Sequence, residues 1–261
     1  MKRTRLGVVD FANSRPLVWA LENDPGIELI YDHPAAVSDL LVAGRIDAGL
    51  VPLAAHLGGA GVASVPGISI ASAGPVWSVK LFGPNLPTET THRLSRVGVD
   101  HRSRSSVALL RILLGYLDGP PVEFVLVDAA QRLDIQGEVL DPGLDAVLAI
   151  GDLALGRPGG WDLGAAWDRR YGLPFVYALW VTARAADAEE LAPRLQAARD
   201  EGLEKLDTYL EHDVRIAHLD RALVRAYLST AIDYRLTDEH RKGMEIFRSR
   251  GVFGVEGFSV R

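Results

Sequence analysis

The amino-acid sequence predicts a two-lobed α/β protein with a ligand cleft between the lobes. From residue 5 onward, short apolar segments of strand type alternate with segments of helical periodicity, as in sheets of parallel strands joined by right-handed crossovers. The same order begins again near residue 95, where SRVGVD repeats the pattern of the earlier RLGVVD. The repetition indicates one α/β unit up to about residue 82 and a second from about 95 to 175.

The first unit contains three predicted strands separated by two helical segments. The strands are RLGVVD (5–10), IELIYDHP (27–34) and AGLVPL (48–53), and the helices are LVWALEND (17–24) and AVSDLLVAGRID (36–47). AGLVPL is almost wholly apolar, as expected of a strand that is covered on both faces. More strand-type sequence follows in VASVPGISIASAGPVWSVKLFG (62–83).

The second unit repeats this order, and the chain then returns to the first. A helix follows Asp100, and VEFVLVD (122–128) and LDAVLAIGDLAL (144–155) supply strands. The apolar run PFVYALWVTAR (174–184) is placed to cross back, and the pattern is helical from Asp187 onward, with a helix start at Thr237. We therefore expect lobe I to comprise residues 1–82 and 180–261, and lobe II residues 83–179.

Composition excludes several classes of function. The 261 residues are 48% hydrophobic and 24% charged with a net charge of −6, and no basic or aromatic-rich basic stretch indicates nucleic-acid binding. Cysteine is absent, which excludes disulfides, thiolate chemistry and cysteine-based zinc or iron–sulfur sites. No segment approaches the ~20 apolar residues of a membrane helix, and the first apolar run is too short for a signal peptide. We expect a cytoplasmic protein without a membrane partner.

Known catalytic motifs are also missing. The seven histidines are widely spread without an HExxH-type pair, so we expect no metal site. The sequence has no GxSxG elbow, no phosphate-binding GKS/T loop and no GxGxxG segment, which argues against serine hydrolases, nucleotide hydrolases and classical dinucleotide enzymes.

The run DHRSRSSVALL is the strongest local indication of a binding site. Ser103, Ser105 and Ser106 stand where a strand ends and a helix begins, so their hydroxyls and free N–H groups can surround a carboxylate or phosphate. Arg104 adds a positive charge. An ordinary serine helix cap explains one serine equally well, and three within four residues favour anion binding.

Other strand ends supply further candidates, because loops at the carboxyl ends of strands face the ligand in such folds. These candidates are Asn13, Arg15, Pro52, Gly151 and Asp152. Turn formation alone explains an asparagine at this place, and a helix cap explains Gly151-Asp152. Ser78 lies among strand formers, where a polar residue usually faces solvent, but it is close to the first crossing between the lobes.

Six segments in order resemble one family. They are FANSRPL, DAGLVPL, SAGPVWSVKLF, DHRSRSSVALL, IGDLAL and WDLGAAWDRRYGLPFVYALW. Together, over essentially the whole chain, they are similar to the chorismate dehydratases of the futalosine (alternative menaquinone) pathway, which have a two-lobed periplasmic-binding-protein-like (type II) fold. The serine run of that family often reads S-R-T-S, so Ser105 replaces a threonine and keeps the hydroxyl.

The resemblance implies a lyase without a cofactor that removes water from the dicarboxylate chorismate, giving 3-[(1-carboxyvinyl)oxy]benzoate. It also implies that Asn13 and Ser78 are catalytic; we expect the other candidates, from their places at strand ends and at a helix start, to bind substrate. We expect the substrate's own side-chain carboxylate to take the C3 proton, Asn13 to stabilise developing negative charge, and Ser78 to assist the departing C4 hydroxyl. The alternatives are the sister enzyme 1,4-dihydroxy-6-naphthoate synthase and a non-catalytic small-anion binding protein.

Overall fold

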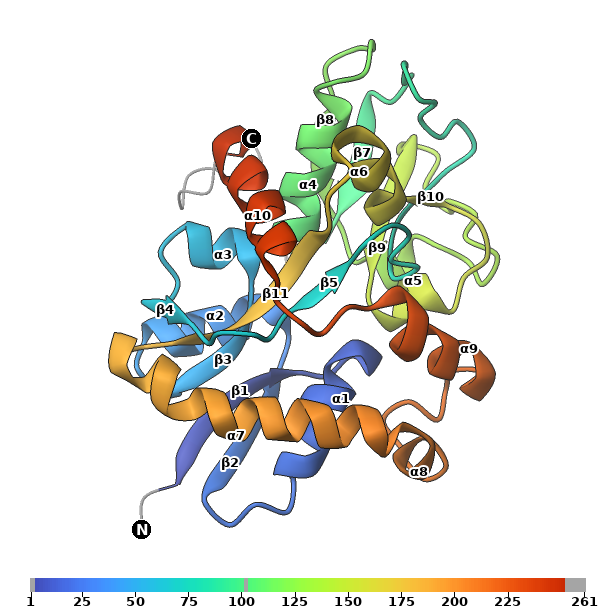
Figure 1. Ribbon diagram of the computed structural model, residues 1–261. Helices are drawn as coiled ribbons and strands as arrows, with labels where there is room; N and C mark the ends of the chain where they lie inside the picture. The colour runs from blue at the N-terminus through green and yellow to red at the C-terminus, as the bar shows by residue number, and fades with distance from the viewer. Residues whose placement is uncertain (1–2, 101–102, 252–261) are drawn as a thin grey trace.

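The computed structural model describes residues 3–100 and 103–251, and these form two sheets with helices around them (Figure 1). The first sheet contains β1 (Thr4–Val9), β2 (Ile27–Asp32), β3 (Ala48–Pro52), β4 (Ala63–Ser64), β5 (Ile70–Ser72) and β11 (Phe175–Thr182). The second contains β6 (Val79–Phe82), β7 (Arg96–Val99), β8 (Glu123–Leu126), β9 (Ala146–Ile150) and β10 (Trp161–Asp162).

The helices lie between and around these strands. They are α1 (Arg15–Val18), α2 (Pro34–Val42), α3 (Leu53–Leu57), α4 (Arg104–Leu114), α5 (Asp152–Leu155), α6 (Leu163–Tyr171), α7 (Ala185–Glu204), α8 (Leu206–Leu210), α9 (Arg221–Ala226) and α10 (Asp238–Arg250). Short 3₁₀ helices cover Ala12–Ser14, Trp19–Leu21 and Ala129–Gln131, and a π-helical turn covers Tyr227–Ala231. None of the helices within the described ranges combines the length and apolar composition needed to cross a bilayer.

Both sheets contain the parallel pairs that the alternation predicts. In the first, β1 pairs in parallel with β2 and β3; in the second, β7 pairs in parallel with β8 and β9. Every residue of β3 is buried, as its unbroken apolar sequence predicts. The parallel strands direct their carboxyl ends toward the same edge of each sheet, and this places the turns after β1, β3 and β9 near the seam between the lobes.

The sheets place both crossings earlier than the predicted lobe boundaries at 82/83 and 179/180. β6 belongs to the second sheet, where Val79 pairs with Ile150, and β11 belongs to the first, where Trp180 pairs with Leu50. The chain therefore crosses within 73–78 and again within 172–174. Apolar strands resemble one another in sequence, so the partner strand rather than the local pattern fixes the sheet.

The helices after β11 lie mainly against the first lobe. The long helix α7 runs beside α1 along this lobe (Figure 1), and Gly202 lies so close to the Pro16 carbonyl that a methyl group there would clash. Helix α10 contacts β11 and begins after Thr237, which confirms the predicted start. The π-helical turn after α9 returns the chain to the seam between the lobes.

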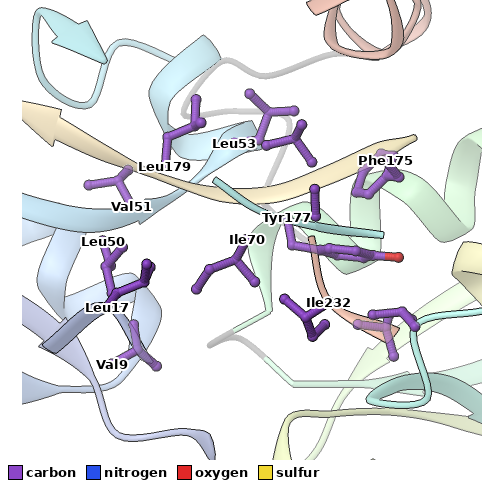
Figure 2. Packing of buried hydrophobic residues seen from close by; sticks show 14 of the residues in the cluster. Val9, Leu17, Leu50, Val51, Leu53, Ile70, Phe175, Tyr177, Leu179 and Ile232 are labelled. Atoms are coloured by element: carbon purple, nitrogen blue, oxygen red, sulfur yellow. The ribbon is translucent and has the colours of Figure 1, made fainter. Parts of the chain in front are cut away.

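One large apolar cluster joins the two lobes. Figure 2 shows part of it, with Leu50 of β3, Ile70 of β5 and Tyr177 of β11. Along β9 the side chains alternate: Leu148 packs into this cluster, while Val147 faces a second, smaller one on the opposite side of the sheet. The second sheet is therefore covered on both faces, and the large core extends up to the seam.

Candidate active site

A pocket lies at the seam, with walls from both lobes. It contains about 620 Å³ of atom-free space, a figure that includes open solvent at its mouth. Its apolar walls include Val9, Leu50, Ile70 and Val79, which continue directly into the large core. The polar groups in the lining therefore stand out against an apolar background and determine which ligand fits.

Seven of the nine residues predicted for the site line this pocket. They are Asn13, Pro52, Ser78, Ser103, Ser105, Ser106 and Gly151. They come from the ends of β1, β3 and β9, the start of α4 and the first crossing between the sheets. The remaining two do not line the pocket: Asp152 directly follows the lining residue Gly151, and Arg15 stands two positions after Asn13.

Ser103 is a buried residue of the pocket wall. It is 4% exposed, stands at the N-cap of the eleven-residue helix α4, and makes no side-chain capping bond. Its Oγ has no hydrogen-bond partner among the described residues. A buried hydroxyl without a partner costs free energy, which a ligand oxygen would recover, and the helix N-terminus favours a negative charge there.

Ser105 lines the same wall, but its hydroxyl is engaged. Its Oγ accepts a hydrogen bond from the Ala54 N–H at 3.0 Å and donates one to the Tyr177 carbonyl at 3.2 Å. Both partners belong to the first lobe, so Ser105 holds the lobes together. The two serines thus differ in what they can offer a ligand, although the sequence pattern treats them alike.

Asn13 and Ser78 are joined through a tyrosine that the sequence analysis missed. The Asn13 Nδ2 donates to the Tyr227 hydroxyl at 3.1 Å, and the Tyr227 hydroxyl donates to the Ser78 Oγ at 2.7 Å. A second tyrosine, Tyr234, donates to the Asn13 carbonyl at 3.0 Å. Burial raises the pKa of Tyr227 far above its ordinary value, so its hydroxyl keeps its proton at neutral pH.

The backbone around Ser78 is tightly held. Its neighbour Trp77 has φ of 62°, a left-handed conformation that bulky residues rarely adopt, and its N–H donates to the Asp162 carboxylate at 2.7 Å. The Ser78 carbonyl accepts from the Gly151 N–H at 2.8 Å. Gly151 itself has φ of 61° and faces the Phe11 ring, where a Cβ would come within 2.8 Å. Such strained positions often occur at functional sites.

Contrary to the prediction from the sequence, the structure does not place Arg15 where it could bind a substrate in the pocket. Its side chain is 2% exposed and forms ion pairs with Asp213 at 2.5 Å and with Glu22 at 2.9 Å. Although burial opposes the charge, the hydrogen bond to Glu22 and the nearby carboxylates raise the pKa of Arg15 above its ordinary value. The guanidinium therefore anchors the turn that carries Asn13 and does not reach the pocket.

Asp152, also predicted to bind substrate, instead forms a contact between the two lobes. Its Oδ1 accepts a hydrogen bond from the Ala12 N–H at 2.9 Å, and so the second lobe caps the turn after β1. Its Oδ2 lies 3.9 Å from His218 Nε2. Burial raises the pKa of this carboxyl group above its ordinary value. The contact joins the lobes beside the pocket without lining it.

Arg104 provides the charge on the pocket wall. It lines the pocket, and its guanidinium lies 3.0 Å from the Asp39 carboxylate of α2 in the first lobe. None of the described lining residues is Asp, Glu, His or Lys. Within residues 3–100 and 103–251, no group of three or more acidic or histidine side chains could hold a metal ion.

Solved structures share this fold at low sequence identity. Protein AF1704 of Archaeoglobus fulgidus has a TM-score of 0.70 at 15% identity, over 95% of this chain and 96% of that one. The periplasmic aliphatic sulphonate binding protein of Escherichia coli has a TM-score of 0.65 at 15% identity, over 95% and 91%. The predicted periplasmic-binding-protein-like fold is confirmed, and fold and pocket together define a two-lobed α/β protein with a pocket at the seam between its lobes.

Comparison of sequences identifies the family, which similarity of fold alone does not. The chain belongs to the menaquinone biosynthesis family, whose model matches residues 4–252. It is 30% identical to the chorismate dehydratase of Thermus thermophilus over 268 aligned positions, which cover 93% of each chain. The family resemblance that the sequence motifs predicted is therefore confirmed.

Proposed function

We propose that this protein is a chorismate dehydratase, a lyase that converts chorismate to 3-[(1-carboxyvinyl)oxy]benzoate in the futalosine route to menaquinone. The name of the Thermus thermophilus relative and the family membership support this activity. The observation that carries it is the convergence of Asn13, Ser78 and Ser103, from both lobes, on one apolar pocket. A cytoplasmic location is part of the proposal, as expected for an enzyme of cofactor biosynthesis.

The pocket suits a small dicarboxylate. One carboxylate would accept a hydrogen bond from the Ser103 hydroxyl at the start of α4, with Arg104 nearby. The apolar walls would contact the ring. The two carboxylates distinguish chorismate from neutral cyclohexadienes, and charge-assisted donors are the groups that recognise this difference.

The proposed reaction uses donors of the protein and a base from the substrate. The substrate's side-chain carboxylate takes the C3 proton, the C3–H electron pair forms the new ring double bond, and the C4–O bond breaks. The departing hydroxide and the abstracted proton leave as one water, so no oxidant or reductant is needed. Asn13 donates to the developing negative charge, Ser78 donates to the departing oxygen, and aromatisation makes the step strongly favourable.

The test is turnover of chorismate by the purified protein, followed by the appearance of an aromatic ultraviolet-absorbing product. We expect Asn13→Ala and Ser78→Ala to lower kcat on the order of 10²-fold to 10³-fold, as removal of a preorganised donor does elsewhere. Ser249→Ala is the matched control, because this exposed hydroxyl donates to the Ile246 carbonyl on α10 and does not line the pocket. Near-wild-type rates in both site variants would refute the assignment.

The same assay separates the alternatives. Stable binding of chorismate without any product would indicate a small-anion binding protein. Failure to consume chorismate, together with turnover of the later cyclic intermediate of the pathway, would indicate 1,4-dihydroxy-6-naphthoate synthase. Product formation from chorismate excludes both.

A further inference from the structure

We propose that Tyr227 is a positioning residue that fixes the direction of hydrogen bonding between Asn13 and Ser78, so that the Ser78 hydroxyl proton points into the pocket. The inference rests on the proposed function, because it assigns that proton to the departing hydroxyl oxygen. Tyr227 does not line the pocket and acts only through its two neighbours.

The first step concerns the single proton of the Tyr227 hydroxyl. A phenol donates one hydrogen bond and accepts others through its lone pairs. Tyr227 donates to the Ser78 Oγ at 2.7 Å, so the contact with Asn13 at 3.1 Å requires Asn13 to donate. Tyr227 thus orients the Asn13 amide, with its nitrogen toward Tyr227, as well as the Ser78 hydroxyl.

The second step concerns where the Ser78 proton goes. Because the Ser78 Oγ accepts from Tyr227, its own O–H must donate elsewhere, and Ser78 is 1% exposed with the pocket beside it. A chain of donors, each polarised by the one before, strengthens the terminal donor. The chain of hydrogen bonds from Asn13 through Tyr227 to Ser78 therefore ends in a strengthened donor that faces the substrate.

The third step concerns how the ring is held. Tyr227 is 1% exposed and opens the π-helical turn Tyr227–Ala231, a rare conformation that occurs frequently at functional sites. Its ring centroid lies 6.4 Å from that of Trp77, whose strained backbone precedes Ser78. Tyr234 fixes the Asn13 backbone independently. Removing the Tyr227 hydroxyl alone should therefore leave the surrounding packing in place.

The experiment compares Tyr227→Phe with Tyr209→Phe in the full-length protein. The Tyr209 hydroxyl is buried without a partner among the described residues, which makes it a matched control away from the pocket. We expect Tyr227→Phe to lower kcat for chorismate about tenfold while KM stays within about twofold, the pattern of a group that acts in the transition state. Tyr209→Phe should leave both constants unchanged.

A double-mutant cycle tests the route through Ser78. In a Ser78→Ala background, Tyr227→Phe should lower kcat less than it does in the wild type, since the Ser78 hydroxyl that Tyr227 orients is already absent. Fully additive losses would overturn the proposal, as would wild-type kcat in Tyr227→Phe while the wild-type protein turns over chorismate.

A second measurement does not depend on turnover. Nuclear magnetic resonance of the Asn13 side-chain amide should show one downfield, slowly exchanging proton that is lost in Tyr227→Phe and retained in Tyr209→Phe. If the wild-type protein does not consume chorismate, the proposed function is wrong. The spectrum then tests by itself whether Tyr227 orients the Asn13 amide. An Asn13 amide that is identical in the wild type and Tyr227→Phe would overturn the inference.

Discussion

Two turns with similar sequences face the pocket, and the structure uses them differently. The turn after β1 is fixed by several contacts. Asp152 accepts the Ala12 N–H, and Tyr227 and Tyr234 form hydrogen bonds with Asn13. Arg15 is buried and forms an ion pair with Asp213. The start of α4 after β7 has instead a buried serine hydroxyl without a partner among the described residues.

The difference separates two tasks that one sequence pattern can serve. A donor that must be in place during a chemical step gains from contacts that fix it beforehand. A group that receives a ligand keeps its hydrogen-bonding capacity until the ligand arrives. On this basis, changes in the first turn should mainly affect stability and turnover, and changes at Ser103 in the second should mainly affect substrate binding.

The largest expected effect is on stability and involves the two arginines. Arg15→Met should destabilise the protein by about 3 kcal/mol, because it leaves the buried Asp213 carboxylate without its charged partner. Arg104→Met removes a pair whose Asp39 partner is 67% exposed, and should cost less than about 1 kcal/mol. Urea unfolding of both variants measures the difference, and equal losses would contradict the distinction between the turns.

A smaller effect is expected at Ser103. Because its side chain makes no capping bond, Ser103→Ala should cost less than about 0.5 kcal/mol of stability, whereas KM for chorismate should rise about tenfold. Asp220→Ala is the control for capping, since the Asp220 Oδ1 accepts the Leu223 N–H at 2.7 Å. That variant should lose about 1 kcal/mol without a change in KM. The reverse pattern would make Ser103 an ordinary helix cap.

The smallest effect is a pH dependence at Asp152. Its carboxyl group has a raised pKa, so the folded protein binds this proton more tightly than the unfolded chain does. The associated stability is present below the unfolded value of 3.8 and is lost as pH rises through the higher folded value.

The uncharged variant Asp152→Asn keeps an oxygen for the Ala12 N–H but cannot ionise. Its Tm should exceed that of the wild type by about 2 °C at pH 7, and the gain should disappear near pH 4. Thermal scans across this range provide the measurement. A Tm difference that does not vary with pH would show that the contact to Ala12, rather than the charge, determines the effect.

Much of the pocket is predictable because it is built from strand ends. Asn13 and Gly151 follow β1 and β9, Pro52 is the last residue of β3, and sheet geometry brings the ends of these strands together. The serine run is predictable in the same way, since a strand-to-helix turn leaves N–H groups free. The motifs that carry the family resemblance lie mostly in these turns.

The parts that sequence analysis missed depend on distant partners. Arg15 is buried by Asp213, 198 positions away, and nothing near Arg15 in the sequence indicates this contact. Tyr227 reaches Ser78 across 149 positions, from a helical segment whose pattern suggests only packing. The predicted lobe boundaries differ from the crossings in the structure for a similar reason. β6 and β11 are apolar strands, and their partner strands decide to which sheet each belongs.

The position of β11 has a consequence for folding during synthesis. β3 pairs with β1 on one side, and β11 pairs with its other edge. Leu50 therefore has no strand partner on that edge until Trp180 has been synthesised. The ribosome must therefore add well over a hundred residues, including the whole second sheet, before the first sheet is complete. During that interval an apolar strand edge stays open to other chains, and unpaired edges of this kind make folding intermediates prone to aggregate.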